Sequence, residues 1–121
     1  MSTNVRYIVD TTSDLAVYEL LGFRVVMHPS PGFAALERDG VKLFLNVPGA
    51  GGAGQPVGGE MPRPGGWNRI QVEIDSLDST LARLREAGVT EHEIVDGIGG
   101  RQALVEDASG NRIELFERSE S

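Results

Sequence analysis

Carboxylate, guanidinium and amide side chains alternate with aliphatic ones in the second half of this 121-residue chain. Arg69, Gln71 and Glu73 fall on one predicted strand, and Glu114 falls on the last. Alternate residues of a β-strand share one face, so we expect these side chains to point together into a cavity. A carboxylate there can accept a proton, bind a metal ion or pair with a guanidinium. Glu114 is therefore the best candidate for function, and a purely structural Glu114–Arg69 ion pair is the alternative.

The residue types limit which chemistry is open to the chain. It contains no cysteine, which excludes disulfides, thiolate metal sites and cysteine nucleophiles. Its two histidines are His28, next to a proline-rich turn, and His92, in a polar stretch, and both are expected at the surface. Acid–base catalysis would have to use Glu73 or Glu114, so the catalytic residues stay unknown. Neither glycine-rich stretch, around 49–59 or 97–100, has the context of a phosphate-binding loop.

The elements that must position these residues occur twice in the same order. In the first half, alternation predicts a strand at 4–10, followed by a helix that Thr11 or Thr12 caps and that ends at Gly22. Three further strands are predicted at 23–28, 33–38 and 41–45. In the second half the strand covers 69–75, and Asp75 or Ser76 caps the helix. Strands at 93–95 and 101–106 and a last strand after the 107–111 turn complete the repeat.

The repeat predicts one domain, residues 1–121, made of two modules. Module one covers about 4–46 and module two about 67–117, with a Gly/Pro-rich linker at 47–66. The linker is either a mobile lid or a disordered connection without a role.

Each module has the pattern βαβββ, which predicts an α+β fold of two tandem modules. A helix covers one face of each sheet, and the other faces are expected to curve into a cup with the helices outside. Phe33, Trp67 and Phe116 are expected on its rim. The predicted lining of the cup comprises Asn4, Arg6, Lys42, Phe44, Arg69, Gln71, Glu73 and Glu114.

Three segments of this frame carry a resemblance to a known family. They are Tyr-Glu-Leu-Leu-Gly-Phe at 18–23, Val-Glu-Ile-Asp-Ser-Leu-Asp at 72–78 and Val-Glu-Asp-Ala-Ser-Gly-Asn-Arg-Ile-Glu-Leu at 105–115. With these segments, nearly the whole chain resembles the vicinal oxygen chelate superfamily, which includes glyoxalase I, extradiol dioxygenases, and the bleomycin and fosfomycin resistance proteins. The resemblance implies a homodimer in which modules can pair within or across chains.

The resemblance also implies where a divalent metal would bind. The four ligand positions of the family's enzymes correspond to Asn4, Phe44, Arg69 and Glu114, and only Glu114 is a usual ligand. Phe44 has no lone pair to donate, and Arg69 would repel a cation. We therefore expect no metal and no other cofactor.

The favoured function is a metal-free small-molecule-binding protein that resembles the bleomycin-resistance type and sequesters an antibiotic or a metabolite. One alternative is a metal-dependent lyase or dioxygenase with unusual ligands. Another is a metal-free enzyme that uses Glu73 or Glu114 as its base. The three hypotheses differ in whether metal binding, ligand binding or turnover depends on Glu73 and Glu114.

The negative net charge of the chain argues against polyanionic partners. The chain carries −7 at neutral pH with its acids spread along the sequence, whereas nucleic acids and anionic membranes require a basic face. No apolar run reaches the length of a membrane span, and no signal peptide pattern is present. We expect a cytoplasmic protein with no nucleic-acid or membrane partner.

Overall fold

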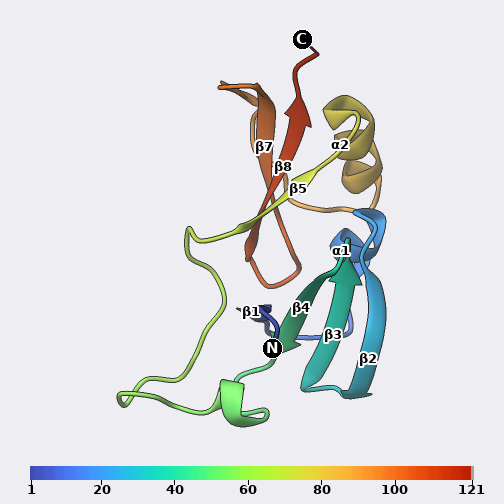
Figure 1. The fold of residues 1–121 in the computed structure, drawn as a ribbon. Coiled ribbons are helices and arrows are strands. Elements are labelled where there is room, and N and C mark those ends of the chain that lie inside the picture. Colours follow the sequence, from blue (N-terminus) through green and yellow to red (C-terminus); the bar gives the residue numbers. More distant parts are fainter. Residues whose placement is uncertain (121) are drawn as a thin grey trace.

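The computed structural model describes residues 1–120, which form two βαβββ modules (Figure 1). Module one comprises β1 (Val5–Ile8), α1 (Ala16–Leu20), β2 (Arg24–Ser30), β3 (Phe33–Arg38) and β4 (Val41–Asn46). Module two comprises β5 (Ile70–Glu73), α2 (Leu77–Glu86), β6 (Val95–Gly97), β7 (Gly100–Glu106) and β8 (Arg112–Arg118). Among the described residues, no helix has both the length and the apolar character needed to cross a bilayer.

The two sheets repeat one topology, which confirms the predicted α+β fold of duplicated modules. Their strand orders are β1-β4-β3-β2 and β5-β8-β7-β6. In each, the first strand pairs parallel with the last and the other pairings are antiparallel. The crossover that contains the helix makes the parallel pairing possible.

The predicted alternation also assigns the faces correctly. Val9, Val72, Ile113 and Leu115 are buried, together with the apolar side of α2. These side chains belong to one hydrophobic core that includes residues of both modules. The polar residues between them must therefore lie on the opposite faces of the sheets.

Several element boundaries differ from the prediction by a few residues, and two of these differences have a clear cause. Helix α1 begins after Leu15, without a side-chain cap, because the Thr12 hydroxyl instead donates to the Pro31 carbonyl at 2.7 Å and contacts His28. Thr11 likewise bonds to Ser13. Strand β6 covers 95–97 rather than 93–95, because a tight turn at 98–99 places Gly97 opposite Gly100. The predicted cap of α2 is confirmed, since the Ser76 hydroxyl accepts from the Ser79 N–H.

The Gly/Pro-rich segment 47–66 is partly folded rather than disordered. It contains a short 3₁₀ helix, η1 (Gly52–Gly54), closed by a 2.7 Å hydrogen bond from the Gly49 N–H to the Gly54 carbonyl. The Gln55 amide donates to the carbonyls of Gly49 and Gly51. Movement of this segment as a lid stays a prediction.

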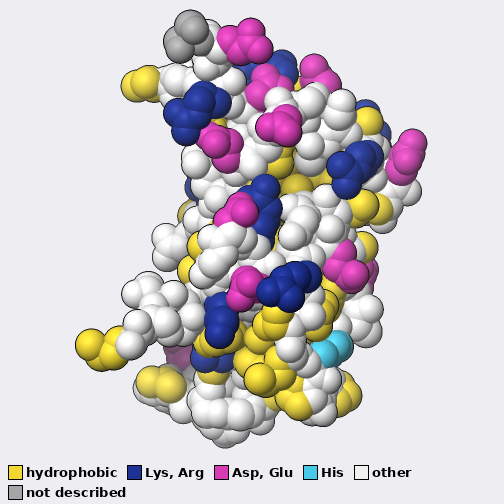
Figure 2. Space-filling model, turned by 45° about the vertical axis from the view of Figure 1, so that its right-hand side comes forward, with side chains coloured by type: hydrophobic (Ala, Val, Ile, Leu, Met, Phe, Trp, Pro, Cys, Tyr) yellow, Lys and Arg dark blue, Asp and Glu magenta, His cyan; other side chains and the backbone are white. Residues whose placement is uncertain are grey.

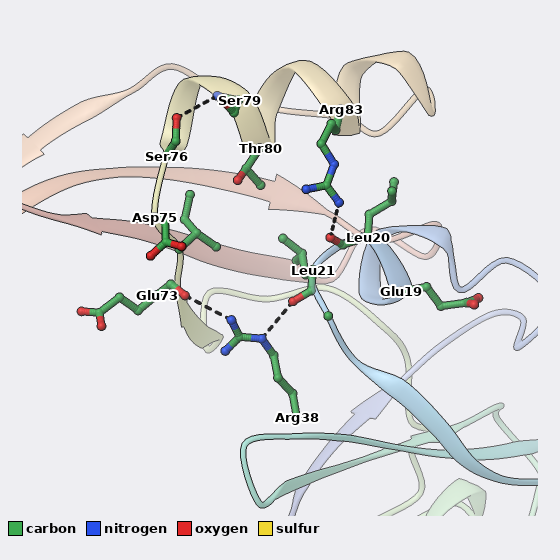
Figure 3. A pocket seen from close by; sticks show the side chains of 12 residues that line it. Glu19, Leu20, Leu21, Arg38, Glu73, Asp75, Ser76, Ser79, Thr80 and Arg83 are labelled. Carbon is green, nitrogen blue, oxygen red and sulfur yellow. Dashed lines mark hydrogen bonds between the residues drawn. The ribbon is translucent and has the colours of Figure 1, made fainter.

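The modules also contact each other through arginine side chains, beside a cavity of about 540 Å³ (Figure 3). Arg38 donates to the Leu21 carbonyl at 2.9 Å and to the Glu73 carbonyl, and Arg83 of α2 donates to the Leu20 carbonyl. These guanidinium groups close the seam between the modules on their helical side, so we interpret this cavity as part of the interface.

Candidate binding site

The polar face of the second sheet holds a compact ion-pair cluster. Arg69 donates to one oxygen of Glu114 through Nε at 3.0 Å and Nη2 at 2.8 Å. The Gln71 amide donates to the other oxygen at 2.7 Å. Only 13% of the Glu114 side chain is exposed, so both carboxylate oxygens are held by protein donors away from bulk water. We call Arg69, Gln71 and Glu114 the Glu114 cluster.

The polar face of the first sheet holds an aromatic and cationic cluster. The guanidinium carbon of Arg6 lies 5.1 Å from the centre of the Phe44 ring, which is a cation–π contact. The same guanidinium donates to the buried Asn46 side chain, and Phe33 packs against Phe44 at 5.8 Å between ring centres. We call Arg6, Phe33, Phe44 and Asn46 the Arg6 cluster.

The strand register shows that these clusters occupy equivalent places in the two modules. Arg6 is the cross-strand partner of Phe44, and Gln71 is the partner of Glu114. Phe44 therefore stands in module one where Glu114 stands in module two. Among residues 1–120 no side-chain hydrogen bond joins the two clusters: the Arg6 cluster bonds within module one and to Ala50 of the 47–66 segment, and the Glu114 cluster bonds within module two.

The residues present do not fit a divalent metal. Both oxygens of Glu114 already accept from Arg69 and Gln71, and a guanidinium beside the carboxylate repels a second cation. Phe44 offers no donor atom. Within the described part of the chain, no three His, Asp or Glu side chains gather as metal ligands would.

The structure places the other predicted lining residues at the margins. Asn4 lies before β1 and is exposed, with a 3.4 Å contact to Ser2, and Lys42 is exposed on β4. Glu73 pairs with Arg118 at 2.7 Å near the end of the second sheet. Gln71 and Glu73 line a cavity of about 380 Å³ together with Asp39, Val41, Leu43 and other residues of the two modules, whereas Lys42 does not line it.

A second cavity, of about 270 Å³, lies next to the Glu114 cluster and is lined in part by Arg112, which the sequence interpretation missed. Trp67, Arg69 and Arg112 line one side of it. Arg112 lies over the Trp67 ring, with its guanidinium carbon 3.9 Å from the ring centre. Arg112 precedes Glu114 by two residues, so the alternation of β8 already indicated that it shares the polar face.

Both predicted surface histidines are exposed and make local contacts. His92 lines the 270 Å³ cavity and pairs with Glu106 at 2.7 Å, while His28 contacts Thr12.

A buried polar network joins the turn between β7 and β8 to module one. The Tyr18 hydroxyl donates to Asp107 at 2.6 Å, and the other Asp107 oxygen accepts the N–H groups of Ser109 and Asn111. The Asn111 amide donates to Asp107 and to the Ile8 carbonyl. Because Tyr18 and Asp107 come from different modules, this network helps to fix how the two polar faces are oriented.

Tyr7 makes a second connection between the modules. Its hydroxyl accepts the Ile70 N–H at 2.8 Å and donates to the Arg112 carbonyl at 2.9 Å. Tyr7 thus connects β1 to the β5 and β8 strands that carry the Glu114 cluster.

Both tyrosines predict a loss of stability in alkali. Burial raises the pKa of Tyr18, and the negative charge of Asp107 raises it further; burial also raises the pKa of Tyr7, against an opposing effect of the Ile70 N–H. In the unfolded chain both groups ionise near pH 10. The folded state therefore retains protons that the unfolded state loses, and stability falls as pH rises above about 10.

Urea unfolding followed by circular dichroism between pH 8 and 11 tests this. We expect the urea concentration at the unfolding midpoint to fall steeply above about pH 10 in the unmodified protein, and less steeply in Tyr18→Phe. The only lysine is the exposed Lys42, so lysine contributes little to this transition. A midpoint that stays constant up to pH 11 would contradict the assignment.

No family model matches the sequence, and no curated protein is similar to it. Solved structures do match. A glyoxalase/bleomycin resistance protein/dioxygenase from Nocardioides superposes with a TM-score of 0.72 at 23% identity, over 100% of this chain and 85% of that one. An antibiotic binding protein, TnmS3 from Streptomyces sp. CB03234, superposes with a TM-score of 0.64 at 24% identity, over 98% of both chains.

A third match is a bleomycin-binding protein solved in complex with bleomycin. It superposes with a TM-score of 0.63 at 18% identity, over 98% of this chain and 99% of that one. At these identities the likeness establishes the fold.

Proposed function

We propose that this chain, which has the fold of the glyoxalase/bleomycin resistance/dioxygenase superfamily, binds a small organic molecule without a metal ion. The binding surface is the polar face of the two sheets, and the role is sequestration of an antibiotic or a metabolite. The observation that carries the proposal is the Glu114 cluster, in which Arg69 and Gln71 take up the one carboxylate that could bind a metal.

The lining of these faces supports a binding role. Aromatic rings, guanidinium groups and an amide lie on or beside these faces, which is the mixture found in sites for partly aromatic ligands. Two proteins of the same fold are an antibiotic binding protein and a bleomycin-binding protein.

We also propose that the chain acts as a homodimer in the cytoplasm. The edge strand β2 exposes Val25, Val26 and Met27, and hydrophobic side chains gather over the lower part of the view in Figure 2, where module one lies. An exposed apolar edge strand favours association with another chain. Light scattering coupled to gel filtration should report twice the mass of one chain, and a monomer at micromolar concentration would contradict the dimer.

The competing function is a metal-dependent lyase or dioxygenase that uses Glu114. We expect the purified protein to contain no stoichiometric metal, and we expect Mn²⁺, Ni²⁺, Zn²⁺ and Fe²⁺ to leave its melting temperature unchanged, because a ligand must bind the folded state to raise it. Elemental analysis and thermal-shift titration measure this. One ion per chain that is lost in Glu114→Gln but kept in Glu86→Gln, an exposed helix control, would overturn the metal-free proposal.

The same thermal-shift assay, run with antibiotics and metabolites, tests binding itself. A hit is then tested for turnover in Glu73→Gln and Glu114→Gln. Turnover that these variants abolish while binding survives would favour the metal-free enzyme instead.

A further inference from the structure

We propose that the ligand is a planar, apolar molecule that carries one acidic group, with its ring packed on the exposed part of Trp67 and its acidic group bound by the guanidinium of Arg112. This inference rests on the proposed binding function and assigns its chemical class. It concerns the 270 Å³ cavity lined by Trp67, Arg69, Arg112, His92 and Val95 among others.

Trp67 is the first element of the argument. It is the only tryptophan of the chain, and its side chain is 69% exposed although it is a large apolar ring. Arg112 covers one side of the ring, 3.9 Å from its centre. An exposed indole that is held in place by a stacked cation is a preformed surface for a second flat ring.

The charge of Arg112 is the second element. Arg69, its neighbour in the cavity, is neutralised by Glu114, but within residues 1–120 Arg112 forms no ion pair. It donates to the Gly66 carbonyl and leaves other N–H groups available. In a chain of net charge −7, a cation without a carboxylate partner at a cavity wall indicates an anionic ligand.

The remaining walls define the rest of the ligand. Val95 is half exposed and, with Leu104, offers apolar surface, and the volume is suited to a small ligand. His92 is engaged with Glu106, whereas Glu93 lines the cavity without an ion pair in the described part of the chain. Because Glu93 repels additional negative charge, we assign a single acidic group rather than several.

Arg112 also has a structural role that the test must separate from ligand binding. Its bond to Gly66, together with the bond from Arg69 to the Trp67 carbonyl, holds the segment before β5 against the sheet. A purely structural Arg112 would affect charged and neutral ligands equally, while an Arg112 that also binds the ligand would affect the acid more than the neutral amide.

The experiment compares three probes of one shape: 2-naphthoate, 2-naphthamide and 2-naphthylmethylamine. Calorimetry measures affinity, and the single indole N–H signal of Trp67 in a ¹H–¹⁵N spectrum reports contact with the cavity. We expect naphthoate to bind and to shift this signal, with the amide about tenfold weaker because one charge-assisted hydrogen bond is lost. The amine should bind weakest.

Variants then assign the charge. Arg112→Gln should reduce naphthoate affinity about tenfold more than it reduces that of the amide. Arg118→Gln, an exposed arginine that does not line this cavity, is the control and should change neither. Glu93→Gln should increase the affinity for naphthoate, since the substitution removes a negative charge that repels the acid. Each melting temperature verifies that the variant is folded.

Several results would overturn the assignment: equal affinities for acid and amide, tighter binding of the amine, or equal losses for both ligands in Arg112→Gln. If no probe binds but the wider screen finds a ligand, the chemical class is wrong and the proposed function stands. A stoichiometric metal at Glu114 overturns the proposed function itself, whatever the probes do.

Discussion

Replacing Asp107 with alanine is expected to lower the free energy of unfolding by about 3 to 5 kcal/mol, which is a large part of the stability of a small domain. Asp107 is 7% exposed and accepts hydrogen bonds from Tyr18, Ser109 and Asn111. The truncation leaves several of these donors without a partner, and each unpaired buried donor costs about 1 to 3 kcal/mol.

Urea unfolding at neutral pH, followed by circular dichroism, measures the loss. Asp96→Ala is the control, because Asp96 is exposed on β6, and it should change stability by less than about 0.5 kcal/mol. Tyr18→Phe removes only one donor and should cost about 1 kcal/mol. If Asp107→Ala loses no more stability than the Asp96 variant, the network does not hold the modules together.

The sequence predicted the fold because the fold depends on local patterns that occur twice. Period-two alternation placed Ile70 and Val72 toward the core, and it placed Arg69 with Glu114 on the other face. Their ion pair follows directly, since β5 and β8 lie side by side and Gln71 stands opposite Glu114. Patterns of this kind survive because a shift of one residue would expose the whole apolar face.

The network between the modules was not predictable in the same way. Asp107 and Asn111 entered the sequence analysis as turn residues, and all three residues lie in segments that carry the family resemblance, but nothing indicated that Tyr18 would contact Asp107. Their contacts depend on how the two modules are oriented, and no periodicity in the sequence encodes that angle. The Thr12 cap failed because of a contact within module one: the Thr12 hydroxyl donates to the Pro31 carbonyl in the turn between β2 and β3, and no local pattern encodes this contact.

The site was predictable in part. The alternation that identified Glu114 also covers Arg112, but the partner of Arg112 is Trp67, which lies in an irregular segment where no pattern fixes a side-chain direction. The equivalence of Phe44 and Glu114 shows that the two copies have diverged in chemistry. One offers an aromatic ring beside an arginine, and the other offers a carboxylate neutralised by an arginine.

Gly100→Ala is expected to destabilise the chain by about 3 kcal/mol through a backbone collision. A Cβ atom on the buried Gly100 would lie 2.1 Å from the Glu117 carbonyl oxygen and 2.8 Å from the Phe116 ring. The oxygen belongs to β8, the strand paired with β7, so relief requires the two strands to separate where Gly100 faces Arg118.

The matched control for this prediction is Gly52→Ala in the 3₁₀ helix. A Cβ atom on Gly52 would have no heavy atom within 4 Å beyond its chain neighbours, and the φ of Gly52 is not positive, so alanine should be neutral or slightly stabilising. Urea unfolding of both variants distinguishes the local collision from the general effect of adding a methyl group. If the two variants are equally stable, β7 and β8 can move apart at this end without cost. The cavity would then lose a rigid support, because β6, which carries Val95, pairs with β7 at Gly100.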